Sequence, residues 1–521
     1  MYKKTRRTVC FVTPFFLLLT LVLYPAFSAS NDLEYESFPE TWQDKLDEFT
    51  NSDKTPGAIM IVHSPEWGVR VGVSGMADLE TLAPPTPDIQ FRVGSVTKMF
   101  TAMVILQMES EGLIRFDDTV DKYLTGDVKL EVNADTVTII DLLQMKSGLP
   151  SYLENNTLAN SINTNPLNAW QPSQLLQFAN EGTKSFDPGQ TYPNPYQTAL
   201  FGTAADEAAP EPYWWYVNTN YLILGMIIEK VTGNKIEDEL KERIFDRLDM
   251  QDSHFAVDEQ IPDRMMRGYS KENLLQHPTG TIENWKDITI LNPSFAWSAG
   301  SIISTPWDLM RFLKAIFTED IIINKGIRKK WLNYVSADIH WMGMEYGVGG
   351  LMQSHRPYGD CRGHGGAING FKDLLYYFYD DETFVVICLN TMDGETEVDI
   401  LDTITPMVID YPVNYPTPAS NKANVEFTVG NILNLQWQAG TIYGDQYEIM
   451  IGTDYDTVSM SETADYTTTD RSYTINTLNE NTTYYWKVDA VSDAKGRVQG
   501  PVWSFTTGSY GPTVIPNWET F

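Results

Sequence analysis

A serine and a lysine stand three residues apart at the start of a long apolar segment. Ser95 and Lys98 belong to the run 91–98, and residues 99–111, which follow it, are predicted to form a helix. Residues at positions i and i+3 of a helix lie on the same face, so we expect the serine hydroxyl and the lysine amine to be neighbours. Such a pair can supply a nucleophile and its base without a histidine.

The spacing is a weak signal on its own, because serine is also a good helix N-cap. A second copy, Ser492 to Lys495, falls in a polar turn without a helix or an apolar context, and we discard it. Lys98 must be neutral to act as a base, which requires its pKa to fall by about three units from about 10.4. Its apolar neighbours Met99 and Phe100 favour the burial that lowers a lysine pKa.

A tyrosine and an asparagine two residues apart form a second candidate element. Tyr216 can relay a proton, and Asn218 can hydrogen-bond a substrate or Lys98. A similar triplet occurs at 192–194, but its prolines block a continuing helix. Asn218, in contrast, runs directly into a predicted helix at 221–231, so we choose Tyr216 and Asn218.

A glycine-rich run at 363–371 forms the third candidate element. Its glycines would let the backbone approach a ligand closely, and one of its backbone N–H groups can complete an oxyanion hole with that of Ser95. The alternative is that His364 is a turn residue without a ligand. The six histidines include no pair with metal-ligand spacing, and the sequence predicts no metal or other cofactor. A Gly-x-Ser-x-Gly elbow is absent, which disfavours an α/β-hydrolase.

The elements that must hold these groups mix helix and strand patterns over residues 36–410. β-Branched and aromatic runs flank polar turns near both ends of this region, which predicts hairpins, and longer apolar patterns between them predict helices. Strands are expected at 58–62, 68–75, 373–378 and 383–389, and helices at 221–231, 236–245 and 307–317. This order indicates one antiparallel sheet covered by helices, together with an all-helical part.

The N-terminus is typical of a secretory signal peptide. Four basic residues within positions 3–7 precede an apolar run at 11–23, and small residues follow at 26–29. An uncleaved anchor is the alternative, which the prolines at 14 and 25 and the shortness of the run disfavour. We therefore expect residues 1–29 to be removed and the protein to be exported, to a bacterial periplasm or outside the cell, with no further membrane segment. A net charge of −32 over 521 residues disfavours binding to nucleic acid or anionic membranes.

The pattern of residue types along the chain changes near residue 411. Residues 411–420 are predicted to be a proline-stiffened linker, and short alternating runs over 421–508 indicate a β-sandwich. Residues 509–521 are expected to form a loose tail. Cys361 and Cys388 would remain in an exported chain, where they can pair as a disulfide or stay as buried free thiols.

The three motifs, in this order, resemble those of the serine β-lactamase and penicillin-binding protein superfamily. The pattern is most similar to the branch of class C β-lactamases, D-alanyl-D-alanine carboxypeptidases, D-aminopeptidases and family VIII esterases. Supporting stretches that also resemble this branch are 142–143, 147–150, 186–189, 221–233 and 299–305. The resemblance implies an α/β (α+β) transpeptidase-like catalytic domain, with an antiparallel sheet beside a helical subdomain and the active site between them.

The same resemblance implies a role for each motif. Ser95 would attack a carbonyl carbon to form an acyl-enzyme, and Lys98 and Tyr216 would shuttle the proton. Asn218 would orient the substrate and Lys98. The site would need no cofactor.

The glycine-rich triplet departs from the family. His364, Gly365 and Gly366 stand where true β-lactamases and penicillin-binding proteins have Lys-Thr-Gly, and Ala367 would supply the second oxyanion-hole N–H. Histidine in place of lysine removes a permanent cation that would grip a substrate carboxylate. Met145 and Lys146 stand where members of the family often have Thr-His. Residues 191–215 form an insertion, which we expect to lie beside the entrance of the site.

These features favour an exported serine hydrolase that cleaves ester or D-amino-acid amide or peptide bonds. The substrate would be a small molecule or peptide, including peptidoglycan-derived ones. A D-alanyl-D-alanine carboxypeptidase or β-lactamase proper is the alternative within this class. An alternative of another class is a non-catalytic protein that binds the cell wall or another surface polymer.

The C-terminal region resembles a fibronectin type III domain, a small immunoglobulin-like sandwich. Trp437 matches the early core tryptophan, and Leu478 with Tyr484 matches the leucine and corner tyrosine of that fold. Residues 500–507 match a common ending of such domains. The domain is expected to act as a spacer or as an accessory binder of a surface polysaccharide, and the sequence leaves these two roles open.

Overall fold

The computed structural model describes residues 35–507 with gaps. The residues outside the description within this range are 66, 127, 185–186, 189–213, 257–260, 272–284, 337–343, 357, 395, 410–412, 418–421, 426–432, 440–445, 462, 476–477, 493–495, 499 and 501. The predicted signal peptide and C-terminal tail also lie outside it. In the part of the chain that is described, no helix combines the length and the apolar character needed to cross a membrane.

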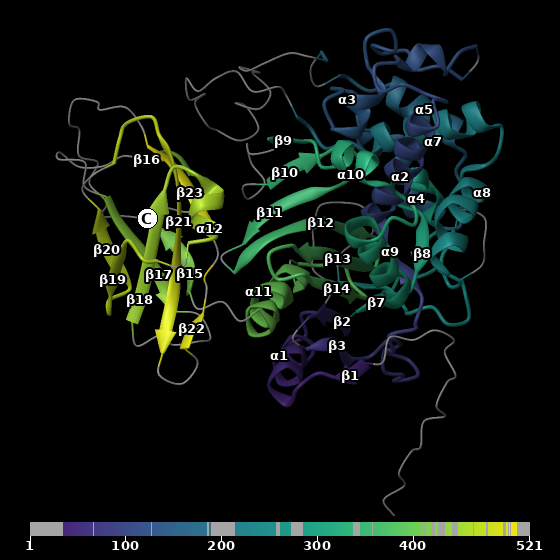
Figure 1. The fold of residues 1–521 in the computed structure, drawn as a ribbon. Helices are drawn as coiled ribbons and strands as arrows, with labels where there is room; N and C mark the ends of the chain where they lie inside the picture. The colour runs from purple at the N-terminus through teal and green to yellow at the C-terminus, as the bar shows by residue number, and fades with distance from the viewer. Residues whose placement is uncertain are drawn as a thin grey trace, which may run out of the picture.

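A nine-stranded sheet forms the centre of the region at 35–409 (Figure 1). Adjacent strands are antiparallel except β1 and β3, which are parallel. The order is β1 (Tyr35–Ser37), β3 (Gly68–Gly75), β2 (Gly57–Ser64), β14 (Thr383–Leu389), β13 (Phe371–Phe378), β12 (Gly359–Ile368), β11 (Met352–Arg356), β10 (Met344–Gly347) and β9 (Tyr334–Ser336). Both predicted hairpins are present, and β14 pairs with β2, so the two ends of the region meet at the centre of the sheet.

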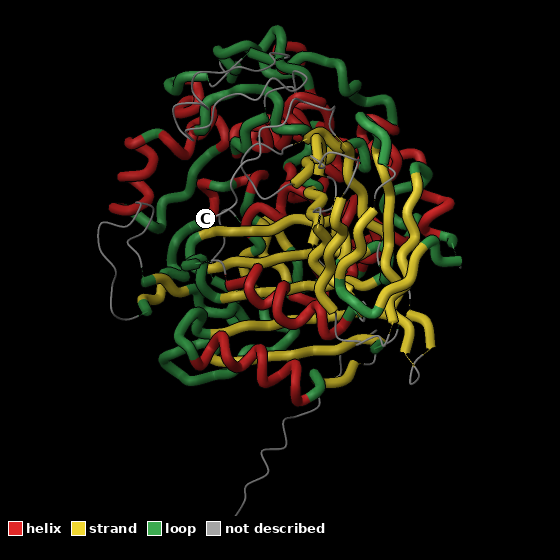
Figure 2. The backbone as a smooth tube through the Cα atoms, turned by 90° about the vertical axis from the view of Figure 1, so that its left-hand side faces the viewer, coloured by secondary structure: helices red, strands yellow, loops and turns green. Residues whose placement is uncertain are grey.

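Helices cover both faces of this sheet, as Figure 2 shows. Helices α1 (Glu40–Asn51) and α11 (Thr396–Val408) contact each other and close one face. Leu374 and Tyr376 of β13 point into the core on that side, whereas Phe371 and Leu375 point into the larger core on the other. Alternate residues of a strand face opposite sides, which is why one strand serves two cores.

The larger core is built around two almost completely buried helices, α2 (Thr97–Ser110) and α7 (Asn218–Thr232), which pack together. Helix α7 ends at Gly233, whose φ of 77° suits glycine. The predicted helix at 236–245 is α8 (Ile236–Leu240) followed by a π-helical turn at Lys241–Phe245. The other helices are α3 (Ile139–Leu143), α4 (Asn156–Thr164), α5 (Pro172–Asn180), α9 (Pro306–Thr318) and α10 (Lys325–Trp331).

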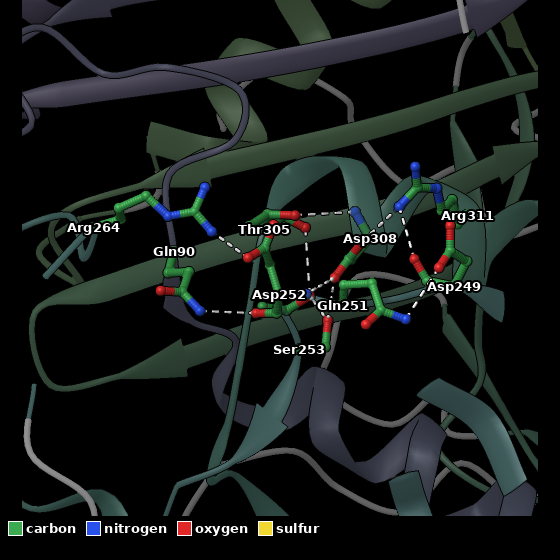
Figure 3. Close-up of polar contacts among 10 residues, drawn as sticks. Gln90, Asp249, Gln251, Asp252, Ser253, Arg264, Thr305, Asp308 and Arg311 are labelled. Carbon is green, nitrogen blue, oxygen red and sulfur yellow. Dashed lines mark hydrogen bonds and ion pairs between the residues drawn. The ribbon is translucent and has the colours of Figure 1, made fainter. Parts of the chain in front are cut away.

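A polar network fixes the short strand that leads to Ser95 (Figure 3). This strand, β4 (Phe91–Arg92), pairs with β8 (Ile302–Ser304), which also pairs with β5 (His254–Phe255). Next to β4, the Gln90 side chain donates to the Asp252 carbonyl at 2.9 Å. The buried Asp308 carboxylate accepts from the Asp252 N–H at 3.2 Å and from Ser253 Oγ at 2.8 Å. The chain is therefore anchored just before the nucleophile candidate.

The C-terminal region contains two facing sheets. One is β15 (Val413–Thr417), β17 (Leu433–Ala439) and β20 (Ser472–Ile475), and the other is β16 (Lys422–Val425), β23 (Val502–Thr507), β21 (Thr483–Ser492), β18 (Gln446–Gly452) and β19 (Tyr466–Thr468), with β22 (Gly496–Val498) on β21. Trp437 of the first sheet and Trp486 and Phe505 of the second share one core. A short helix, α12 (Tyr455–Ser459), lies between β18 and β19 in the chain. Within residues 35–409, β6 (Tyr269–Ser270) and β7 (Lys286–Asp287) pair with each other, and Tyr269 also forms a bridge with Thr391.

This description corrects one expectation and decides between two alternatives that the sequence left open. Residues 413–417 of the predicted linker form β15, an edge strand of the first sheet. An edge strand tolerates Pro416 because one side of the strand makes no ladder hydrogen bonds. A proline-rich sequence that favours an extended backbone is therefore compatible with a linker and with an edge strand alike. Cys361 and Cys388 are free and buried. They lie on β12 and β14, which β13 separates, and they point into different cores.

Candidate active site

Ser95 lies on a 3-10 turn, Gly94–Val96, that runs directly into α2. The Val96 N–H donates to the Val93 carbonyl at 3.1 Å and closes the turn. Ser95 is partly exposed, whereas its neighbours are buried. No side chain caps α2 or the turn, so Ser95 is not an N-cap. Ser95 is therefore a partly exposed residue at an otherwise buried helix start.

Lys98 is completely buried one turn further along. Its Nζ lies 3.0 Å from Ser95 Oγ, 2.7 Å from Asn218 Oδ1 and 2.9 Å from the Ala299 carbonyl oxygen. None of these partners is a carboxylate. Burial therefore lowers the pKa of the Lys98 amine well below its ordinary value, which is the condition for a lysine to serve as a general base.

Tyr216 closes the other side of Ser95. The Lys98 Nζ lies 4.9 Å from the centre of the Tyr216 ring. Burial raises the pKa of the Tyr216 phenol, and a hydrogen bond with Ser95 opposes that rise only in part. The phenol is therefore neutral near pH 7 and can pass a proton while Lys98 accepts one. Ser95 and Lys98, predicted from one motif, and Tyr216, predicted from another, meet at one place.

Asn218 is the first residue of α7, and Val217 before it is extended. This bend lets Tyr216 and Asn218 reach the same space, with Asn218 Oδ1 on the lysine. The rejected triplet at 192–194 lies outside the described residues, as does most of the predicted insertion. Trp215, at the end of the insertion, donates its N–H to the Met145 carbonyl at 3.0 Å, which ties the Tyr216 segment to the replaced Thr-His position.

His364 lies on β12 rather than in a turn, and it is 1% exposed. Its ring centre is 6.3 Å from that of Tyr216 and 6.2 Å from that of Tyr346. Nδ1 contacts the Gly365 carbonyl, and Nε2 has no partner among the described residues. Burial lowers the pKa of His364 to about 3, with a contribution from repulsion by the nearby Lys98 amine once that amine is protonated in acid. The imidazole is therefore neutral, and this position holds no cation.

The glycines of β12 allow it to pack directly against the turn that carries Ser95. A Cβ on Gly94 would stand 2.9 Å from the backbone nitrogen of Ala367, and a Cβ on Gly366 would overlap the Val93 carbonyl oxygen. Gly365 is different, because a Cβ there would meet nothing closer than 3.7 Å. The backbones of Ser95 and Ala367 are thus neighbours, as two donors of an oxyanion hole must be.

Sequence reasoning assigned no role to three contributors to this site. The Ala299 carbonyl accepts from Lys98, although its Ala-Gly-Ser stretch supported the family resemblance. Tyr346 on β10 is buried against Tyr216 and His364, and Trp214 lies 5.5 Å from it between ring centres. A carbonyl and two aromatic residues carry no motif of their own, so only proximity identifies them. Among the described residues, no group of three His, Cys, Asp or Glu side chains could hold a metal ion.

Comparison with known proteins agrees with this geometry. A family profile described as Beta-lactamase matches residues 42–404. The chain is 26% identical over 351 residues to D-aminopeptidase of Brucella anthropi, which covers 66% of this chain and 58% of that protein. It is 22% identical over 361 residues to teichoic acid D-alanine hydrolase of Staphylococcus aureus, covering 68% and 75%. Among solved structures, a D-stereospecific amidohydrolase from Streptomyces sp. superposes with a TM-score of 0.58 at 26% identity, over 71% of this chain and 99% of that one.

Proposed function

This chain belongs to the beta-lactamase family and is a serine hydrolase of the penicillin-binding-protein-like type, and we propose that Ser95 is its nucleophile. The observation that carries the proposal is the contact between Ser95 Oγ and the Nζ of Lys98, which is buried and faces no carboxylate. A buried lysine without a counter-ion is held in its neutral form. A neutral amine at hydrogen-bond distance from a partly exposed serine is a nucleophile with its base.

The reaction follows from these positions. Ser95 Oγ attacks the carbonyl carbon of the substrate while its proton passes to Lys98, and the carbonyl π electrons move to the oxygen. The N–H groups of Ser95 and Ala367 stabilise that oxyanion. When the carbonyl reforms, the bond to the leaving alcohol or amine breaks, and the proton reaches the leaving group through Tyr216. Water then attacks the carbonyl carbon of the acyl-Ser95, and the same residues transfer its proton to Ser95 Oγ. This step releases the acid and restores the serine.

The substrate class follows from the charge of the site. His364 is neutral, so the β12 wall offers no permanent cation to a carboxylate beyond the scissile bond. Uncharged esters and amides therefore suit this wall better than substrates that end in a carboxylate. The names of the relatives, a D-aminopeptidase and a teichoic acid D-alanine hydrolase, support an ester or D-amino-acid amide. A D-alanyl-D-alanine carboxypeptidase or β-lactamase proper remains the second candidate within the same chemistry, whereas the assembled nucleophile and base disfavour a non-catalytic polymer binder.

The proposal includes export and a role for the C-terminal region. The basic and apolar start of the sequence supports secretion. In the C-terminal region, the Asn479 N–H donates to the Tyr484 hydroxyl at 2.8 Å, at the start of β21. A tyrosine that bonds back to the chain at this corner is typical of immunoglobulin-like sandwiches, and it supports a fibronectin type III-like spacer or binder of a surface polysaccharide.

The test of the nucleophile uses p-nitrophenyl butyrate and a fluorophosphonate probe. The wild type should show a burst of p-nitrophenol and one probe adduct by intact mass, and Ser95→Ala should show neither. Equal labelling of wild type and Ser95→Ala would contradict the proposal. Release of D-alanine from D-alanyl esters, D-alanine amide and a D-Ala-D-Ala peptide, measured beside nitrocefin turnover, separates the candidate substrates.

A further inference from the structure

A buried carboxyl group lies behind the proposed oxyanion hole. Asp373 is on β13, where its backbone is opposite Gly366 of β12 on one side and Cys388 of β14 on the other. It is 1% exposed, and neither carboxyl oxygen has a hydrogen-bond partner among the described residues. An unpaired polar group in a core costs stability, so its position here calls for a reason.

The carboxyl group lies beside the backbone of Gly366, on the side where the Val93 carbonyl approaches it. A Cβ placed on Gly366 would overlap Asp373 Oδ1 and the Val93 carbonyl oxygen at the same time. These two oxygens therefore lie next to the same point of the β12 backbone, 2.0 and 2.4 Å from the position of that Cβ. The Val93 carbonyl closes the turn that carries Ser95, and Gly366 directly precedes Ala367. Asp373 thus lies where the nucleophile turn and the oxyanion strand join.

The surroundings of the Asp373 carboxyl group favour its neutral, protonated form. A carboxylate facing a carbonyl oxygen would place two acceptors against each other, whereas a carboxylic acid can donate its proton to the carbonyl. Burial and the nearby Glu397 carboxylate raise the pKa of Asp373 well above its ordinary value. The titratable groups around Asp373 are consistent with a neutral acid. Cys388 is a buried thiol whose pKa is also raised by burial, and the Lys372 amine is bound by Glu397 at 3.0 Å.

We propose that Asp373 is a positioning residue, a carboxylic acid that holds the Val93–Val96 turn against β12 so that the Ser95 and Ala367 N–H groups converge on the substrate oxygen. The inference rests on the proposed acyl-Ser95 reaction and adds a group that never touches the substrate. Displacing a reacting group by about 1 Å can cost on the order of 100-fold in rate, so a support of this kind affects kcat more than KM.

Two substitutions of nearly the same shape separate positioning from packing. Asp373→Asn keeps a donor, whereas Asp373→Leu keeps the branched outline and removes it. With p-nitrophenyl butyrate at pH 7, we expect Asn to retain kcat within about threefold and Leu to lower kcat by about 10- to 100-fold with KM little changed. Cys388→Ala, on the same face but on the far side of Asp373, is the matched control and should behave as wild type.

Two outcomes would overturn the inference. One is a folded Asp373→Leu enzyme with wild-type kcat. If the Leu variant does not fold, the alkaline end of the pH profile decides: the wild type should lose kcat there as Asp373 ionises, and Asp373→Asn should not, so parallel profiles refute the idea. Failure of the proposed function is distinct, because it appears as a wild-type enzyme without a Ser95 adduct, whereas failure of this inference leaves that adduct and its rate intact in every variant.

Discussion

The Nζ of Lys98 lies 2.7 Å from Oδ1 of Asn218, a residue 120 positions further along the chain. This contact joins the N-terminal turn of α7 to the N-terminal turn of α2, where the two largely buried helices pack together. The amide neutralises no charge, but it fixes the direction of the amine toward Ser95. An uncharged partner at this place lets burial lower the pKa of Lys98, and several predictions depend on that choice.

Replacing the lysine should remove both activity and a pH-dependent part of the stability. Lys98→Met is expected to lower kcat/KM for p-nitrophenyl butyrate by about 1,000-fold, the size of a general-base contribution. The pKa of Lys98 is lower in the folded than in the unfolded chain. Between those two values the unfolded chain binds more protons, so stability rises with pH. Urea denaturation at pH 7 and pH 9.5 should show the wild type gaining stability relative to Lys98→Met, and a constant difference would argue against a lowered pKa.

A carboxylate at position 218 should move the acid limb of the activity profile. Asn218→Asp places a negative charge on the lysine and favours its charged form, so the pH at which kcat/KM reaches half its maximum should rise by about one unit or more. Asn218→Leu, which removes the acceptor without adding charge, should lower the rate and leave that midpoint near the wild-type value. A midpoint unchanged in the Asp variant would mean that Lys98 is not the titrating base.

Two adjacent glycines should respond very differently to alanine. Gly366→Ala forces a methyl group onto the Val93 carbonyl and the Asp373 side chain, which should separate β12 from the Ser95 turn and lower kcat by about 100-fold. Gly365→Ala adds the same methyl where the nearest neighbouring atom is 3.7 Å away and should stay within about threefold of wild type. Similar rates for both variants would show that close approach at Gly366 does not matter for catalysis.

Restoring a cation on β12 should change the substrate preference. His364→Lys is expected to raise turnover of substrates that end in a carboxylate, relative to neutral esters, by about tenfold, because a charge-assisted hydrogen bond contributes about 1.5–3 kcal/mol. Paired assays of a D-Ala-D-Ala peptide and p-nitrophenyl butyrate measure this ratio. His364→Gln, polar but uncharged, is the control, and an equal ratio in the Lys and Gln variants would contradict the role proposed for this position.

Protonation of His364 should also weaken the protein in acid. Its pKa is about 3 when folded, against an ordinary value of 6.5. The unfolded chain therefore binds a proton between these values that the folded chain excludes, and stability is lost as the pH falls from about 6.5 toward 3. His364→Gln should lose less stability than wild type between pH 7 and pH 4.5 in thermal unfolding. Identical losses would mean that the imidazole is not held neutral.

The C-terminal corner offers a test that is independent of catalysis. Tyr484→Phe removes the hydroxyl that accepts the Asn479 N–H and should cost about 1 kcal/mol in the unfolding of the C-terminal region. Tyr473→Phe, on β20 of the other sheet, is the comparison. Among the described residues, this change removes no hydrogen bond between a tyrosine hydroxyl and the backbone. Activity on p-nitrophenyl butyrate should be unchanged in both, and equal stabilities would argue against a tyrosine corner.

Local sequence patterns predicted much of the fold and many of the residues that meet at the site. The hairpins at 58–75 and 373–389 follow from alternating β-branched residues around polar turns, and α7 follows from an apolar run that ends at Gly233. The family match confirms the resemblance that the three motifs indicated, and the structure brings Ser95, Lys98 and Tyr216 together. The predicted linker differs at 413–417 because an extended, proline-containing segment has the same local preferences in an edge strand as in a linker.

Residue types and spacing by themselves determined which side chains could do chemistry: a serine and lysine one helical turn apart, a tyrosine followed by an asparagine, and a glycine run behind a histidine. Only the tertiary structure decided the states of these groups. The neutrality of Lys98 and His364 comes from burial by α7, β12 and their neighbours, and the role proposed for Asp373 depends on its place beside Gly366, near the Val93 carbonyl. Protonation depends on the surroundings of a group in space, and residues distant in sequence supply most of those surroundings.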